Sequence, residues 1–298
     1  MKFTKAEKTQ SRARIALCGP SGSGKTYTAL LLAKGLGDRV ALIDTERGSA
    51  SKYAGDVADF DKLELESFSP ELYVEAIRAA DNAGYDVIVI DSLSHAWSGK
   101  GGALELVDAA AARGKGNSFA AWRGVTPMQQ AMVDAMLQAK AHVIATMRTK
   151  TEYVLEEGPG GKKVPRKIGM APIQRDGIEY EFDVVGDLDH DHRLVITKSR
   201  CSALSDAVIT KPGADVARTI REWLSTGAAP AAKESPVAGI VALLESAGTL
   251  EDLAAARDKA REMIKCLRAH ERDAAIAALT AARDTAAARI EHKGATEE

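Results

Sequence analysis

The sequence has few cysteines, few aromatic residues and almost no net charge, and each scarcity excludes a class of protein. Its three cysteines, Cys18, Cys201 and Cys266, are widely spaced and form no C-x-x-C pair, which argues against a disulfide framework and a zinc knuckle. Because the formal net charge is −2, a nucleic-acid-binding surface has to be a local patch. No apolar run approaches the roughly 18 residues that cross a bilayer, and residues 1–14 lack a signal peptide's apolar segment. These absences predict a cytoplasmic protein without a membrane partner.

A glycine-rich stretch at residues 19–26 fits the pattern G-x-x-x-x-G-K-[ST], which is typical of a phosphate-binding P-loop. The apolar run 15–18 precedes it and a helical pattern follows it, as expected for a loop between a strand and a helix. Backbone N–H groups of such a loop, together with the positive end of the helix, bind phosphate oxygens. The sequence therefore predicts a site for ATP and Mg²⁺ formed by Gly19, Pro20, Ser21, Gly22, Ser23, Gly24, Lys25, Thr26 and Tyr27.

Two acidic residues follow apolar strands and suit the chemistry of ATP hydrolysis. Asp91 ends the apolar run 85–91 and is expected to hold Mg²⁺ together with the Thr26 hydroxyl. Glu46 follows the strand predicted over 39–44, where a carboxylate can face the γ-phosphate and activate the attacking water. Continuous apolar runs like these are typical of strands buried on both faces of a parallel sheet, so the predicted fold class is α/β.

Further along the chain the pattern predicts a helix from Ser69-Pro70 to about Ala83, because serine and proline are favoured at a helix start. The turn 189–192 contains His190 and His192, which we expect to be solvated rather than metal ligands. The remaining predictions are strands at 63–68 and 142–146, helices at 122–140 and 213–225, and hairpins spanning 152–168 and 180–198 with turns at 158–161 and 189–192.

Composition divides the chain into four segments. Residues 1–14 are a basic lead-in, residues 15–226 the α/β core, and residues 227–236 a linker rich in alanine and proline. Residues 237–298 are rich in alanine, with charges at helical spacing that predict a small appendage of two or three helices. Because the apolar faces of these helices are mostly alanine, we expect them to need a packing partner.

The order of these motifs resembles the RecA-like recombinase core, and within it the phage-encoded RecA-like single-strand annealing ATPases of the Sak type. The resemblance covers about residues 12–225 and implies a RecA-like P-loop NTPase with a mostly parallel central sheet flanked by helices. The segments that carry it are Gly19–Leu32, Asp44–Gly48, Thr149–Asp187 and Lys198–Cys201.

Residue roles follow from this resemblance. Glu46 takes the place of the catalytic base, and Lys198 and Arg200 take the places of basic residues that reach ATP bound by the neighbouring subunit. Arg148 ends a strand where the family has a γ-phosphate sensor, usually glutamine. The resemblance thus implies a homo-oligomer with ATP at its subunit interfaces.

RecA-like proteins grip DNA with two loops, and the matching segments here are 94–118 and 148–178. Trp97, Phe119 and Trp122 in and beside the first segment offer surfaces for base stacking. Within 158–178 a single acid, Asp176, stands against five basic residues, an excess that favours phosphate binding. These basic residues are Lys162, Lys163, Arg166, Lys167 and Arg175.

The resemblance therefore implies an ATPase stimulated by single-stranded DNA that promotes annealing or strand pairing, with a single-strand-binding protein as a further candidate partner. Two alternatives remain open from the residues alone. One is a ring-shaped helicase or loader built on the same core. The other is a nucleotide-gated adaptor that does not turn over ATP and acts through its C-terminal helices.

Overall fold

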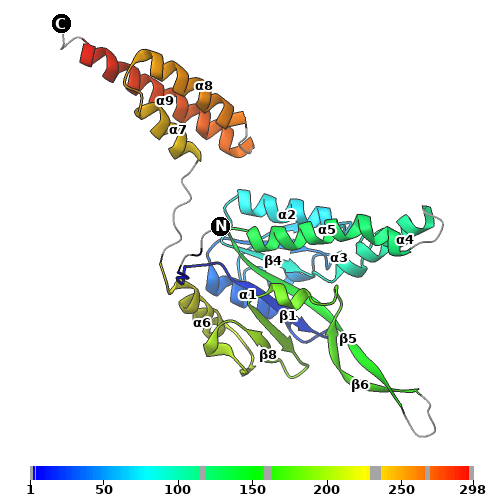
Figure 1. Ribbon diagram of the computed structural model, residues 1–298. Coiled ribbons are helices and arrows are strands. Elements are labelled where there is room, and N and C mark those ends of the chain that lie inside the picture. Colours follow the sequence, from blue (N-terminus) through cyan, green and yellow to red (C-terminus); the bar gives the residue numbers. More distant parts are fainter. Residues whose placement is uncertain are drawn as a thin grey trace.

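The computed structural model describes residues 3, 5–113, 118–157, 163–228, 236–265 and 269–294. Within them the chain forms a three-layered α/β core, with a central sheet covered by helices on both faces, and a C-terminal group of helices (Figure 1). This is the mostly parallel RecA-like P-loop fold that the sequence predicts. The strands of the described residues are β1 (Arg14–Gly19), β2 (Val40–Asp44), β3 (Asp61–Glu64), β4 (Val87–Asp91), β5 (His142–Glu157), β6 (Lys163–Pro172), β7 (Val184–Leu188), β8 (Arg193–Ser199) and β9 (Val208–Thr210).

The strands lie in the order β3-β2-β4-β5-β1-β7-β8-β9, with β6 paired only to β5. β1, β2, β3, β4, β5 and β7 run parallel to one another, whereas the pairs β5–β6, β7–β8 and β8–β9 are antiparallel. The carboxyl ends of β1, β2 and β4 therefore meet at one edge of the sheet, where the P-loop, Glu46 and Asp91 follow.

The helices are α1 (Lys25–Leu36), α2 (Pro70–Asn82), α3 (His95–Ser98), α4 (Ala103–Arg113), α5 (Ser118–Gln138), α6 (Ala214–Ser225), α7 (Pro236–Glu245), α8 (Leu250–Lys265) and α9 (Ala269–Gly294). Alternate residues of each central strand face opposite helices. Ile15, Leu17 and Leu42 belong to the core under α1 and α6, whereas Ile43 and Ile90 belong to the core under α2 and α5. Burial on both faces explains why these strands read as unbroken apolar runs.

β5 is far longer than the strand predicted at 142–146. Its first half lies in the sheet between β4 and β1, and from Thr149 onward it pairs with β6 as an antiparallel arm that projects from the core (Figure 1). The predicted hairpin is thus confirmed in its paired strands, while its turn at 158–161 lies outside the described residues.

Other differences from the sequence predictions have local causes. β3 covers 61–64 rather than 63–68, and all four of its residues are exposed at the sheet edge, so little apolar patterning marks it. The segment predicted as a strand from Tyr180 starts as the 3₁₀ turn Ile178–Glu181, and β7 begins only at Val184. α5 begins at Ser118, four residues before the predicted start, and continues through Pro127. The helix predicted at 69–83 is confirmed, with Ser69 Oγ accepting the N–H of Leu72.

The C-terminal segment forms three helices, at the upper end of the predicted number. Ile240, Leu244, Leu253 and Ile264 are buried in a cluster that α7, α8 and α9 form with one another. Within the described residues these helices therefore pack against one another, while Leu250 and Ile276 remain exposed. Cys18 and Cys201 are buried and unpaired, and Cys266 lies outside the described residues. None of the described helices combines the length and apolarity needed to cross a membrane.

Arg14, the last residue of the basic lead-in, is a buried residue at the start of β1. Its guanidinium donates to the carbonyls of Ala13, Leu137, Ala139 and Ala141 at 2.6–3.0 Å. Two of these carbonyls lie at the C-terminal end of α5, where the helix leaves acceptors unpaired. Burial lowers the pKa of Arg14 to about 10. The side chain stays charged and ties α5 to the amino edge of the sheet.

Replacing Arg14 by methionine is expected to lower the free energy of unfolding by about 3 kcal/mol, because several buried carbonyls lose a charged donor together. Urea denaturation followed by circular dichroism measures the change. Arg218→Gln on the exposed face of α6 serves as the control and is expected to stay within about 0.5 kcal/mol of the wild type. A loss below about 1 kcal/mol for Arg14→Met contradicts the assigned role.

Candidate nucleotide site

The P-loop connects β1 to α1 in a conformation that depends on glycine. Gly24, the residue before the helix, has φ 89°, a left-handed value that favours glycine. Lys25 begins α1 and its Nζ donates to the carbonyl of Pro20 at 2.7 Å, across the mouth of the loop. Burial lowers the pKa of Lys25. A half-buried ammonium bonded only to a carbonyl within the described residues is a group that an anion would stabilise.

Asp91 lies at the end of β4 with its carboxylate held between two hydroxyls. Thr26 Oγ1 donates to Asp91 Oδ2 at 2.6 Å, and Thr146 Oγ1 donates to Asp91 Oδ1 at 2.5 Å. Asp91 is 2% exposed, and burial raises its pKa despite both hydrogen bonds. The structure thus brings together Thr26 and Asp91, the two residues predicted to hold a metal.

Glu46 follows β2 on a turn that Asp44 organises. The Asp44 carboxylate accepts the N–H groups of Glu46 at 2.7 Å and Gly48 at 2.8 Å. The Glu46 carboxylate is engaged by Arg148 in a two-pronged ion pair, with Nε–Oε1 at 3.0 Å and Nη2–Oε2 at 2.5 Å. Arg148 is the last residue of β5 in register with β1, opposite Gly19. The predicted base and the predicted sensor therefore meet beside the P-loop.

A further polar residue of the site, His95, was missed from sequence. Its Nδ1 lies 2.7 Å from Thr45 Oγ1, and that hydroxyl accepts the N–H of Ser92 directly after Asp91. The imidazole stacks on Phe68 at 4.9 Å between ring centroids. Burial and the charge of Arg148 lower the pKa of His95, which favours the neutral ring. Nothing in the sequence indicates this role, because His95 lies three residues after the Asp91-Ser92 pair that ends the strand motif. It also belongs to a helix of only four residues, too short to show a helical pattern.

Beside the P-loop lies a cavity of about 600 Å³, a volume within the range of ligand pockets. Tyr27 and Tyr53 form part of its wall and meet edge to face, with ring centroids 5.8 Å apart. His192 and Lys211 also line it. The cavity begins at Gly22 and Lys25, so a molecule bound by the loop through its phosphates has room for a base and a sugar here.

His192 differs from the solvated residue predicted at the β7–β8 turn. The side chain is exposed, but its Nδ1 lies 3.2 Å from the carbonyl oxygen of Ser23 in the P-loop. A Cβ on Gly24 would come within 3.3 Å of the same nitrogen. The expected absence of a metal cluster stays a prediction, although the described residues contain no grouping of three or more metal-binding side chains.

Lys198 and Arg200 lie at the amino edge of the sheet, not beside the P-loop of their own chain. β8 runs antiparallel to β7 so that Lys198 pairs with Val185, and the N–H of Arg200 donates to Asp183 O. Gly19 is five residues from Arg14, a separation of roughly 15 Å along a strand. Lys198 Nζ donates to the carbonyls of Glu179 and Tyr180, and Arg200 forms an ion pair with Asp183 at 2.8 Å.

The residues predicted to bind DNA fall in and beside the β5–β6 arm. Lys163, Arg166 and Lys167 lie on β6, and Lys162 lies outside the described residues. Arg175 lines a cavity of about 560 Å³ together with Trp97, Phe119, Trp122 and Arg123. The two tryptophans stack with ring centroids 5.5 Å apart, and Phe119 is 86% exposed.

The donor set fits a nucleotide with Mg²⁺. Mg²⁺ is commonly bound by one or two protein oxygens together with substrate phosphates. Thr26 and Asp91 supply such oxygens, and no other acidic, histidine or cysteine side chain of the described residues joins them in a cluster able to hold a metal alone. Lys25 adds an ammonium at the mouth of the loop. A cation here would need phosphate oxygens to complete its ligand shell.

Comparison with known families agrees with this geometry. A family model described as an AAA domain matches residues 11–210, well over half of the chain. The chain belongs to this AAA-domain family. Membership of the AAA-domain family places it in the P-loop NTPase superfamily and makes it a nucleotide-binding ATPase. No curated protein matches the chain.

Asp91→Asn is expected to raise the Tm of the nucleotide-free AAA-domain protein at neutral pH. Because burial raises the folded-state pKa of Asp91 above its value of about 3.9 in an unfolded chain, the charged form costs stability at pH 7. Asparagine removes that charge and keeps a partner for both hydroxyls.

The gain is full above the folded-state pKa and vanishes as the pH falls below about 3.9, where the carboxyl becomes protonated in the unfolded state as well. Thermal unfolding in EDTA over a pH series measures it, with Asp86→Asn as a control carboxylate. An Asp91→Asn variant less stable than the wild type at every pH contradicts the assignment of Asp91 as a desolvated, charged residue.

Proposed function

We propose that the chain is a Mg²⁺-dependent, DNA-stimulated ATPase that binds single-stranded DNA and promotes annealing or strand pairing. The observation that carries this proposal is the course of β5. This strand contacts the nucleotide site through Thr146 and Arg148 and then continues as one arm of the β5–β6 hairpin. The hairpin bears the basic residues of β6. One covalent element therefore joins the groups that would sense ATP to the surface that would hold nucleic acid.

In the proposed complex Lys25 exchanges the Pro20 carbonyl for β- and γ-phosphate oxygens. Thr26 and Asp91 hold Mg²⁺, which when bound neutralises charge that develops on the phosphates. The phosphates restore to Lys25 an anionic partner, which offsets the burial that lowers its pKa. Gly22 and Gly24 let the loop backbone approach the phosphates closely.

Glu46 orients the attacking water and accepts its proton as the water oxygen bonds to the γ-phosphorus and the bond to the β-phosphate oxygen breaks. In the nucleotide-free protein Arg148 donates to both oxygens of Glu46, so the guanidinium competes with a water molecule for the carboxylate. A γ-phosphate is a stronger attraction for the guanidinium than one carboxylate. Arg148 therefore shifts toward the phosphate and frees Glu46.

The same shift couples hydrolysis to DNA. Arg148 immediately precedes Thr149, the first residue of β5 that pairs with β6. A change in the position of Arg148 is thereby passed to the base of the arm, as in other switches that respond to a γ-phosphate. Lys198 and Arg200, at the amino edge, complete the site of a neighbouring subunit in this proposal, since neither reaches its own P-loop.

Single-stranded DNA lies on the arm and in the cavity lined by Trp97, Phe119 and Trp122. Basic residues of β6 neutralise phosphates, and Arg123 and Arg175 flank the aromatic surfaces. Exposed aromatic rings accept bases by stacking regardless of sequence. This combination suits a protein that pairs strands of any sequence.

Glu46→Gln is expected to lower kcat for ATP by about 10²–10⁴-fold with little change in ATP affinity, because only proton transfer is lost. Lys25→Ala is expected to abolish ATP binding, and wild-type turnover is expected to rise with single-stranded DNA and to require Mg²⁺. Steady-state hydrolysis with and without DNA at two salt concentrations measures this, with Glu75→Gln on the exposed face of α2 as the control.

Three outcomes contradict parts of the proposal. Turnover per site that does not fall when the oligomer is diluted to monomer excludes the role of Lys198 and Arg200 in the neighbour's site. Directional unwinding of a forked duplex indicates a helicase or loader instead. Tight ATP binding without turnover in either condition, with a partner protein lost on truncation at Ala228, indicates an adaptor.

The two parts of the DNA surface are expected to separate in a salt titration. Replacing Lys163, Arg166, Lys167 and Arg175 together by glutamine reduces the slope of log affinity against log salt by about 0.7 for each lost phosphate contact. Phe119→Ala weakens binding by about 1–3 kcal/mol at a nearly unchanged slope, because it removes stacking. Fluorescence anisotropy with labelled oligothymidine measures both, with Arg78→Gln as the control. Slopes identical to the wild type exclude the arm from the DNA interface.

A further inference from the structure

A second cavity, of about 310 Å³, lies at the amino edge of the sheet, away from the P-loop. Three parts of the chain line it: residues 10–12 before β1, His142 at the start of β5, and Arg221, Leu224 and Ser225 near the end of α6. The lead-in is fixed here by backbone hydrogen bonds between Gln10 and Ala228 and between Ala228 and Lys8. Gly227, with φ 114°, allows this approach, since a Cβ there would lie 2.4 Å from Lys8 O.

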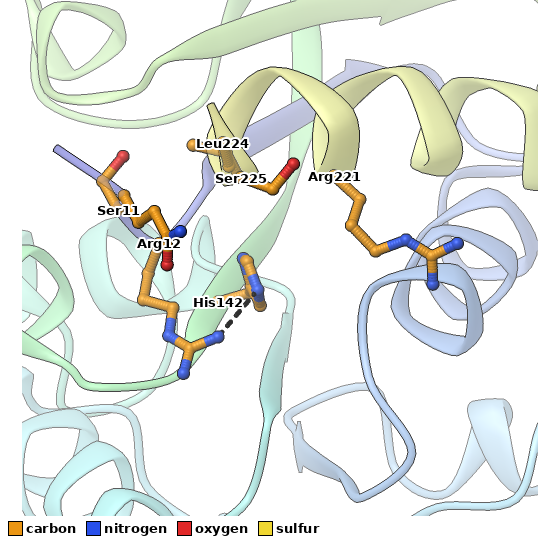
Figure 2. A pocket seen from close by; sticks show the side chains of 7 residues that line it. Ser11, Arg12, His142, Arg221, Leu224 and Ser225 are labelled. Atoms are coloured by element: carbon orange, nitrogen blue, oxygen red, sulfur yellow. Dashed lines mark hydrogen bonds between the residues drawn. The ribbon is translucent and has the colours of Figure 1, made fainter. Parts of the chain in front are cut away.

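His142 has one ring nitrogen whose role is fixed. Its Nδ1 lies 2.9 Å from the backbone nitrogen of Ala13, which can only donate, so Nδ1 accepts and carries no proton. The neutral ring must then carry its proton on Nε2. This Nε2 faces Nη1 of Arg12 at 3.3 Å, along the dashed line in Figure 2. An arginine side chain has no hydrogen-bond acceptor, so Nη1–H of Arg12 and Nε2–H of His142 are two donors that face each other without an acceptor between them.

Nothing else in the described residues supplies the missing acceptor. Neither Arg12 nor Arg221 has an ion-pair or hydrogen-bond partner among acidic side chains there. Figure 2 shows Arg12 directed toward His142, whereas Arg221 extends from α6 away from both of these side chains. His142 is itself 5% exposed, so its Nε2–H cannot turn to bulk water at no cost. Burial, Arg12 and Arg14 outweigh Asp86 and lower the pKa of His142 to about 4, which keeps the ring neutral at pH 7.

The end of α6 disfavours an anion in the cavity, because helix C-termini carry partial negative charge. Lys8 offsets it: its Nζ donates to Trp223 O at 2.9 Å and to Thr226 Oγ1. Two arginines and the histidine therefore line the cavity, and no carboxylate is among its lining residues. A group with several acceptor oxygens and two negative charges matches this donor set, and arginine binds phosphate through paired N–H groups.

We propose that this cavity is a binding site for a phosphate group, held by Arg12, Arg221 and the Nε2–H of His142. The site is separate from the P-loop and does not depend on the ATPase proposal. The phosphate is either a free ion or part of a nucleotide or a nucleic-acid strand. All three present the same oxygens to the donors.

The test uses the full chain carrying Lys25→Ala, so that binding at the P-loop does not contribute. Isothermal titration with inorganic phosphate, AMP and oligothymidine is compared with acetate at equal ionic strength. Arg221→Gln and Arg12→Gln are each expected to weaken phosphate binding at least about tenfold, the effect of losing one charge-assisted hydrogen bond. Arg218→Gln, one turn earlier on the same helix and exposed, is the matched control and is expected to leave binding unchanged.

Nitrogen NMR of the histidine side chains gives a second readout. We expect the Nε2–H form of His142 without phosphate, and a higher His142 pKa when phosphate is bound, because the anion stabilises the imidazolium. The ligand whose affinity the Arg12 and Arg221 variants weaken most identifies the source of the phosphate, because binding of oligothymidine elsewhere is insensitive to these variants. Acetate that binds as well as phosphate, or affinity and His142 signals that both arginine variants leave unchanged, overturns the proposal. A wild type without ATPase activity but with this phosphate site would refute only the ATPase proposal.

Discussion

The nucleotide site depends on one buried carboxylate. Asp91 lies at the end of a strand buried on both faces, and its charge would be unsupported without the hydroxyls of Thr26 and Thr146. These two hydrogen bonds join the first turn of α1, the end of β4 and the middle of β5 at a single point. The P-loop, the candidate metal ligands and the strand that leads to the arm are thereby held in fixed positions relative to one another.

This arrangement explains why Arg148 can act as both a restraint and a sensor. β5 is fixed by pairing with β1 and β4 as far as Arg148, and beyond it pairs only with β6. Arg148 therefore stands where a rigid strand becomes a projecting arm, and its partner Glu46 is oriented by the Asp44 turn. An ion pair at such a boundary is sensitive to any anion that competes for the guanidinium. Coupling between the nucleotide site and the β5–β6 arm therefore needs no long path through the core.

Local signals made most of the fold and half of the site predictable. The P-loop pattern, the apolar runs of β2 and β4 and the Ser69-Pro70 helix start each depend on neighbouring residues, and each is observed. Contacts between distant segments gave no such signal. His192 touches the P-loop only because β7 lies beside β1, and Arg14 is buried only because α5 ends above it. The ion pair between Arg148 and Glu46 could likewise be predicted only with knowledge of the strand order, in which β5 lies between β4 and β1.

The two anion-binding edges illustrate this difference. At the carboxyl edge, backbone N–H groups and one lysine within eight consecutive residues form the site, so a short sequence pattern is enough to predict it. At the amino edge, the donors come from residues 12, 142 and 221 and line one cavity only after the lead-in pairs with Ala228 and α6 packs on α1. A basic lead-in with no acidic partner is commonly a solvated tail. Here the position of a buried, neutral His142 changes that interpretation, because its proton has to point at an arginine unless an anion lies between them.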